Sequence, residues 1–166
     1  MSAAQHLRHG FGPVYDAHSR VLILGSFPSA MSREQQFYYG HPRNRFWPLL
    51  SAVLGEALPR SVEEKRALVL RRGVALWDAI EECDITGSSD SSIRNAVPTD
   101  LPRLLRSADI RAVFVNGAAA ERVYRRWQLP LTGLEAQRLP STSPANAAWS
   151  FERLVEAWRV ILDWLE

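Results

Sequence analysis

The stretch Val21-Leu-Ile-Leu-Gly-Ser-Phe-Pro-Ser29 decides the fold class of this chain. Its first four residues form a short, continuous apolar run, which is typical of a strand covered on both faces, as in a parallel sheet. The glycine and the turn-forming residues after it predict that the strand ends at Gly25. In open α/β sheets, ligands bind beyond the carboxyl ends of the strands, so we expect the loop from Gly25 to Ser29 to carry function.

Strands and helices alternate along the rest of the chain. We expect further strands at residues 73–77, 111–115 and 135–139, helices at residues 45–54, 61–72, 99–107 and 118–127, and an amphipathic C-terminal helix whose apolar positions run from Phe151 to Leu165. Such alternation builds a parallel sheet with right-handed crossovers, which place the loops after the strands on one rim. The sequence therefore predicts an α/β fold, a three-layer α/β/α sandwich with a central, mainly parallel four-stranded sheet.

Two segments are expected to have little regular structure. Residues 1–19 form a mostly polar stretch interrupted by Gly and Pro, which indicates a loosely structured N-terminal arm. Residues 86–95 are rich in serine and are expected to form a surface loop. The chain has 166 residues, 46% of them hydrophobic, which suffices for one full core but not for two, so we expect residues 1–166 to be a single domain.

The composition limits the possible partners and cofactors. Among 20 basic residues only Lys65 is a lysine, and arginine binds phosphate well, although a general arginine bias explains the count equally well. Cys83 is the only cysteine, so neither an intrachain disulfide nor a cysteine-rich metal site can form. The spacing of His6, His9 and His18 fits no metal site. Nucleotide-binding glycine motifs are absent as well, so we expect no metal and no cofactor.

Two further motifs complete the pattern. Tyr38-Tyr-Gly-His-Pro-Arg-Asn-Arg-Phe-Trp47 follows the first loop, and Leu139-Pro-Ser-Thr-Ser-Pro-Ala-Asn146 follows the last expected strand. Because the loops after parallel strands meet at one edge of a sheet, we expect these motifs to converge.

Together the three motifs resemble the hypoxanthine (deoxyinosine) DNA glycosylases of the uracil-DNA glycosylase superfamily. The resemblance spans roughly Val21 to Trp164. The second motif is also similar to the mismatch-specific uracil and thymine glycosylases. Those enzymes carry a catalytic Asn inside the first motif, where this chain has Phe27, and this departure favours the hypoxanthine branch.

The resemblance implies a monofunctional DNA glycosylase that hydrolyses the N-glycosidic bond of deaminated bases and so initiates base excision repair. Hypoxanthine would be the first substrate, with uracil and xanthine as further candidates. The implied partner is double-stranded DNA containing a deaminated base. We expect a monomer that acts without a cofactor. We also expect it in the cytoplasm of a bacterial-type cell, associated with the nucleoid, because the sequence contains neither a secretory signal nor an apolar run of the ~20 residues that a membrane span requires.

The resemblance also implies roles for single residues. The family's catalytic Asn lies in the second motif, at the position of Asn44, where its amide could hold the water or the base. Tyr39 takes the place of the aromatic residue that stacks on the base. The expected base-binding residues are Gly25, Ser26, Phe27, Ser29, Tyr39 and Asn116. The expected DNA-binding residues, whose loop would enter the minor groove and bind phosphates, are Ser141, Thr142, Ser143, Pro144, Asn146 and Arg43.

Other interpretations stay open. Asn44 and Asn146 each precede an expected helix, and asparagine is among the best N-cap residues, so either could serve only as a cap. The chain could instead be a mismatch-specific uracil or thymine glycosylase, or a binder of damaged DNA that does not cut it. A small α/β hydrolase with Ser26 as nucleophile is a further alternative, although no histidine follows His41 to act as its base.

Overall fold

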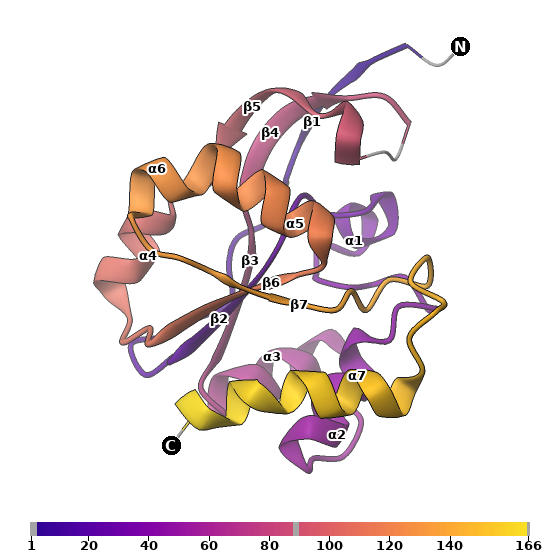
Figure 1. Cartoon of the computed structure of the whole chain (residues 1–166), viewed down its shortest axis with the longest axis vertical. Helices are drawn as coiled ribbons and strands as arrows, with labels where there is room; N and C mark the ends of the chain where they lie inside the picture. The colour runs from indigo at the N-terminus through magenta and orange to yellow at the C-terminus, as the bar shows by residue number, and fades with distance from the viewer. Residues whose placement is uncertain (1–2, 88–89, 166) are drawn as a thin grey trace.

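A central sheet of four parallel strands confirms the predicted fold class (Figure 1). The computed structural model describes residues 3–87 and 90–165, and the expectations for residues 1–2, 88–89 and 166 lie outside this range. The strands are β2 (Val21–Gly25), β3 (Val74–Asp78), β6 (Ala112–Asn116) and β7 (Gln137–Leu139), in the spatial order β3-β2-β6-β7.

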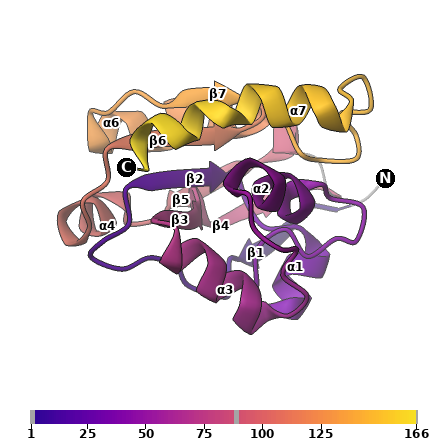
Figure 2. The same ribbon diagram turned by 90° about the horizontal axis from the view of Figure 1, so that it is seen from below.

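Helices cover both faces of this sheet, as Figure 1 shows. On one side lie α2 (Phe46–Leu54), α3 (Val62–Arg71) and α7 (Phe151–Trp158), and on the other α4 (Leu101–Ser107), α5 (Ala118–Val123) and α6 (Leu129–Thr132). Figure 2 shows α2 packed beside α7. A short helix, α1 (Ala30–Gln35), follows the loop after β2. Among the described residues, no helix has the length and apolar character needed to cross a membrane.

The helix ends follow the signals in the sequence. Ser61 caps α3, because its hydroxyl oxygen accepts the N–H of Glu64 while the Glu64 carboxylate accepts the Ser61 hydroxyl. Gly55 ends α2 with φ of 68°, a left-handed conformation that glycine adopts without strain. The helix expected at residues 118–127 runs further, since a π-helical turn (η2, Tyr124–Gln128) joins α5 to α6.

A second, antiparallel sheet is absent from the sequence-based expectations. It consists of β1 (Gln5–Arg8), β4 (Ile80–Ile85) and β5 (Arg94–Pro98) in the order β1-β4-β5. β4 has only three buried residues among charged ones, so it lacks the apolar run that marks β2. Of the expected surface loop at residues 86–95, the described part contains a short 3₁₀ turn (η1, Asp90–Ser92) and the start of β5.

The N-terminal arm therefore differs from the loosely structured segment that we expected. β1 pairs with β4 along its whole length, and Val14 forms a β-bridge with Leu76 of the central sheet. Between them, the side chain of His9 is fully buried. The arm is held by backbone pairing, which a polar sequence does not reveal.

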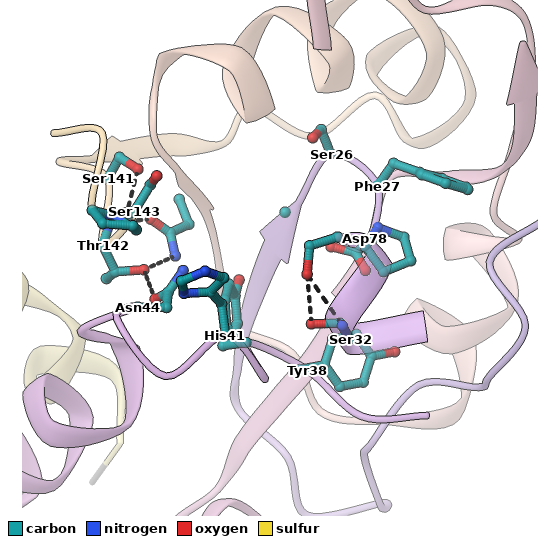
Figure 3. Close-up of a pocket in the computed structure, with 16 residues that line it drawn as sticks. Ser26, Phe27, Ser32, Tyr38, His41, Asn44, Asp78, Ser141, Thr142 and Ser143 are labelled. Atoms are coloured by element: carbon teal, nitrogen blue, oxygen red, sulfur yellow. Dashed lines mark hydrogen bonds between the residues drawn. The ribbon is translucent and has the colours of Figure 1, made fainter. Parts of the chain in front are cut away.

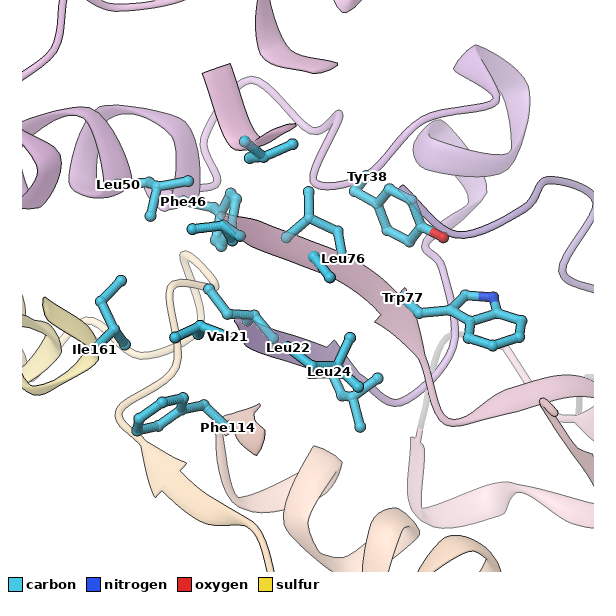
Figure 4. Close-up of a cluster of buried hydrophobic side chains, with 14 of the residues drawn as sticks. Val21, Leu22, Leu24, Tyr38, Phe46, Leu50, Leu76, Trp77, Phe114 and Ile161 are labelled. Atoms are coloured by element: carbon cyan, nitrogen blue, oxygen red, sulfur yellow. The ribbon is translucent and has the colours of Figure 1, made fainter. Parts of the chain in front are cut away.

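The core lies on both sides of β2. Val21, Leu22, Ile23 and Leu24 are all 0% exposed, as expected for a strand covered on both faces. Figure 4 shows Leu22 and Leu24 among apolar side chains from the neighbouring strands and helices. Each such side chain stabilises the fold by about 1.5–3 kcal/mol relative to exposure to water. This packing fixes the end of β2, and hence the position of the loop that follows it.

Candidate active site

A cavity of about 300 Å³ opens at the carboxyl ends of β2, β3 and β6. All three motifs line it, so the convergence expected from the sequence is what the structure contains (Figure 3). The residues from the first motif are Gly25, Ser26, Phe27, Pro28 and Ser29, those from the second are Tyr38, Tyr39, His41 and Asn44, and those from the third are Ser141, Thr142, Ser143 and Pro144. Asn116 completes the wall from the end of β6.

Two of the expected DNA-binding residues lie elsewhere. Asn146 lines a neighbouring cavity of about 700 Å³, which shares Ser26, Asn116, Ser141 and Ser143 with the first. Arg43 is exposed and lines neither cavity. The capping role considered for Asn146 is wrong, because the side chain of Ser150 caps α7 by accepting the N–H of Arg153. Asn146 instead donates from Nδ2 to the carbonyl of Ser141 and so shapes the third motif.

Asn44 is held by two hydrogen bonds to the same atom. Its Oδ1 accepts the backbone N–H of Phe46 at 3.0 Å and the hydroxyl of Thr142 at 2.8 Å. The first bond satisfies an amide at the start of α2, whose N-cap position, Arg45, makes no side-chain cap bond. Asn44 thus lies one residue before the N-cap position that was considered for it, but its side chain satisfies the first amide of α2 and also forms part of the cavity wall. Because both bonds are made by Oδ1, the amide nitrogen Nδ2 is the group through which Asn44 can bind a ligand.

Asn116 is also fully oriented. Its Oδ1 accepts the backbone N–H of Thr142 at 3.1 Å, and its Nδ2 donates to the hydroxyl oxygen of Thr142 at 3.0 Å. Thr142 is 0% exposed, and its backbone carbonyl accepts the N–H of Arg45. One buried threonine therefore joins the end of β6 to the second and third motifs.

The expected stacking residue, Tyr39, forms part of the cavity in a constrained conformation. Its ring stacks on Phe46 with centroids 3.9 Å apart, and its φ of 54° is uncommon for a bulky residue. Among the described residues, its buried hydroxyl has no partner in good hydrogen-bond geometry. Burial raises the pKa of this hydroxyl and the carboxylate of Asp78 raises it further, whereas the nearby side chain of Asn116 lowers it by less, so Tyr39 stays protonated at neutral pH.

The hydroxyl of Ser29, which was expected to donate a hydrogen bond to the nucleobase, is bound within the protein instead. Its hydroxyl caps α1 by accepting the N–H of Ser32, and it donates to the Ser32 hydroxyl at 3.2 Å. Ser32 in turn accepts the N–H of Gly40. The hydroxyl of Ser29 therefore connects the first and second motifs, and its proton is already engaged.

Sequence reasoning missed the buried pair Asp78 and His9. Asp78 follows the apolar run of β3 and lines the cavity while only 4% exposed, and its Oδ2 accepts Nε2–H of His9 at 2.8 Å. Its Oδ1 lies against Gly25, where any Cβ would collide with it, so only glycine fits at this strand end. The rule that ligands bind beyond strand ends could have found Asp78, because the expected strand stopped one residue before it.

The side chain of Arg45 connects the second motif to the third motif and to Trp149, which follows it. The guanidinium of Arg45 donates to the carbonyl of Trp149 at 2.6 Å and to that of Asn146 at 2.9 Å. These bonds hold the third motif against the start of α2. Arg45 is therefore engaged inside the protein, unlike its exposed neighbour Arg43.

In the part of the chain that the structure describes, the site contains several hydrogen-bonding groups held in place, but not the serine–histidine pair that the hydrolase alternative requires. Among the described residues, no hydrogen bond joins Ser26 to a histidine: His9 binds Asp78, and His41 accepts the N–H of Arg43. No group of three or more His, Cys, Asp or Glu side chains in residues 3–87 and 90–165 could hold a metal ion. The cavity instead places the Asn44 amide and the Asp78 carboxylate at different parts of its wall (Figure 3).

Known proteins share both the sequence and this architecture. Residues 13–162 match the family model described as the uracil DNA glycosylase superfamily. Proteins named hypoxanthine DNA glycosylase are 34% identical over 159 residues in Methanosarcina acetivorans, covering 93% of this chain and 98% of the relative, and 33% identical over 144 residues in Methanosarcina barkeri, covering 84% and 88%.

A solved structure agrees with these matches. The solution NMR structure of a Methanosarcina acetivorans protein, assigned provisionally to the uracil DNA glycosylases, superposes with a TM-score of 0.79 at 34% identity and covers 95% of this chain and 96% of that one. The chain therefore belongs to the uracil DNA glycosylase superfamily, whose members are N-glycosylases.

Proposed function

We propose that this protein is a monofunctional DNA glycosylase that removes hypoxanthine from deoxyinosine in double-stranded DNA and so initiates base excision repair. The observation that carries the proposal is the pairing of a fixed amide donor, Nδ2 of Asn44, with a buried acceptor, the carboxylate of Asp78, in one cavity. The names of the two relatives support the same substrate. The base would enter the cavity after flipping out of the duplex.

Hypoxanthine fits this pair of groups better than adenine does. At N1, hypoxanthine carries a hydrogen that a carboxylate can accept, whereas adenine has a lone pair there that a carboxylate repels. The Asp78 carboxylate would therefore select bases with an N–H between ring carbons, which uracil and xanthine also present. Placing the lone pair of adenine N1 against the remaining oxygen of the Asp78 carboxylate would cost binding energy and so disfavour adenine. This contact distinguishes hypoxanthine from adenine but not from guanine, which carries the same N1–H.

Asn44 would act on the departing base. Cleavage of the glycosidic bond leaves negative charge on the purine, and a pre-oriented amide N–H stabilises such charge in a site that excludes water. Asn44 is suited to this because both bonds to its Oδ1 leave the amide hydrogens for the ligand. In this scheme Asp78 selects the base and Asn44 accelerates its departure.

The monofunctional part of the proposal rests on the surroundings of Lys65. An abasic-site lyase needs an amine nucleophile, and this sole lysine lies on α3 with its Nζ over the ring of Trp47, 5.4 Å from the ring centroid. Burial lowers the pKa of Lys65, but the side chain does not line the cavity. Released base should therefore leave an intact abasic strand.

One experiment tests the proposal against its alternatives. Labelled duplexes containing deoxyinosine, uracil, xanthine or no lesion are incubated with the protein, and half of each sample is treated with alkali before denaturing electrophoresis. We expect alkali-dependent cleavage at deoxyinosine and no covalent adduct after borohydride treatment. Cleavage at uracil alone would indicate the mismatch-specific class, and retention of damaged DNA without cleavage would indicate a binding protein.

A further inference from the structure

Thr142 links two carboxamides of the cavity wall, those of Asn44 and Asn116. It lies in the loop after β7, is 0% exposed, and contacts Asn116 and Asn44 through three hydrogen bonds of 2.8–3.1 Å. Figure 3 shows this chain of bonds on one side of the cavity. A hydroxyl has one hydrogen to donate, so its position between two carboxamides determines which group donates in each of these hydrogen bonds.

These directions are fixed at both ends by backbone groups. The N–H of Thr142 can only donate, so the oxygen of Asn116 must face it, and the Asn116 amide must then face Oγ1 of Thr142. Oγ1 receives that amide hydrogen and has a single hydrogen of its own to give, which goes to Oδ1 of Asn44. At the far end, the N–H of Phe46 also requires an oxygen at Oδ1. Neither carboxamide can flip without losing two hydrogen bonds.

We propose that Thr142 is a positioning residue that fixes the donor orientation of the Asn44 amide, an inference that rests on the proposed glycosylase function. Both lone pairs of Oδ1 are used by Phe46 and Thr142, so Asn44 has no acceptor left to draw a proton from the attacking water. Asn44 therefore acts on the leaving base through its N–H groups alone. Thr142 does not touch the base in this role; together with the N–H of Phe46, it fixes which end of Asn44 faces the base.

The test compares three threonine variants in single-turnover cleavage of a deoxyinosine duplex. Thr142→Val keeps the shape and removes the hydroxyl, and Thr142→Ser keeps the hydroxyl. Thr132→Val removes the hydroxyl of a threonine on α6 that binds Tyr124 outside the cavity. We expect Thr142→Val to lose about 10²-fold in rate, as for a misplaced catalytic group, while Thr142→Ser and Thr132→Val stay close to the parent. Melting temperature is measured for each variant.

A double-mutant cycle separates positioning from a general structural effect. If Thr142 acts through Asn44, then Thr142→Val costs little further activity in an Asn44→Ala background. Equal losses in both backgrounds would overturn the proposal, and so would parent-like cleavage by a folded Thr142→Val protein. If the valine variant does not fold, Thr142→Ala carries the same expectations.

Failure of the inference is distinct from failure of the proposed function. A parent protein that leaves deoxyinosine duplexes intact would refute the function whatever the variants do. A parent that cleaves deoxyinosine together with a Thr142→Val variant of equal rate would refute only the role of Thr142.

Discussion

The Oδ1 atom of Asn44 accepts the hydroxyl of Thr142 at 2.8 Å, although the two residues lie 98 positions apart in the chain. This bond joins the second motif to the third and leaves the amide of Asn44 for the cavity. The catalytic proposal for Asn44 thus depends on a contact between distant loops.

The first prediction concerns base selection by Asp78. In Asp78→Asn, His9 keeps an oxygen to donate to, and an amide then faces the cavity where the carboxylate acceptor was. We expect cleavage of deoxyinosine to fall about 10²-fold or more, because the N1–H of hypoxanthine meets a donor, whereas the new amide can donate to N1 of adenine, so the preference for deoxyinosine over deoxyadenosine narrows. Single-turnover assays on both duplexes measure the change.

A matched control is available on β4. Asp84 pairs with His6 at 2.8 Å much as Asp78 pairs with His9, but that pair is exposed and outside the cavity. Asp84→Asn should therefore cleave deoxyinosine as the parent does. Parent-like discrimination between the two bases in a folded Asp78→Asn protein would rule out the selecting role of Asp78.

The second prediction separates two neighbouring arginines in binding to undamaged DNA. Exposed Arg43 is free to neutralise a phosphate, so Arg43→Ala should lower the slope of log affinity against log salt by about one. Arg45 is engaged with the carbonyls of Trp149 and Asn146, so Arg45→Ala should lower the melting temperature and leave the slope nearly unchanged. An unchanged slope in Arg43→Ala would show that this side chain is not a phosphate contact.

The third prediction follows from the buried hydroxyl of Tyr39. Its pKa is raised in the folded protein, whereas tyrosine in the unfolded chain ionises near pH 10, so the unfolded state loses this proton first. The resulting stabilisation is complete below about pH 10 and is lost as the pH rises further. In urea unfolding, the free energy of the parent should therefore fall more steeply between about pH 9 and pH 11 than that of Tyr39→Phe. Identical slopes would mean that Tyr39 titrates alike in both states.

The fold class could be predicted because its main signal is local. The apolar run Val21–Leu24 is 0% exposed, as a strand with two covered faces must be, and the Ser61 cap and the Gly55 stop mark helix ends that the structure contains. Such features depend on a few adjacent residues, so the sequence reveals them directly. β4 escaped this reasoning because charged residues interrupt its buried positions.

The cavity was only partly predictable for a related reason. Motif positions such as Asn44 and Tyr39 were found, since strand ends and a family resemblance point to them. Asp78 was not, because the expected strand stopped one residue before it, and His9 was not, because no local pattern places it against a residue 69 positions away. The buried setting of Thr142 likewise comes from the convergence of two loops, which no local pattern encodes.

The fourth prediction isolates the amide of Asn44. Asn44→Asp keeps an oxygen to accept the N–H of Phe46 and the hydroxyl of Thr142, so the fold and the start of α2 should persist. It replaces the amide donor by a second carboxylate oxygen, which repels charge on the departing base. Asn44→Ser also retains a good cap residue but is too short to reach the ligand.

Single-turnover cleavage of a deoxyinosine duplex by Asn44→Asp, with melting temperature measured in parallel, tests the central claim most directly. We expect a melting temperature close to that of the parent and a rate lower by about 10²–10³-fold, the usual loss for one donor to a developing anion. A well-folded Asn44→Asp protein that cleaves deoxyinosine at the parent's rate would contradict the catalytic role of Asn44.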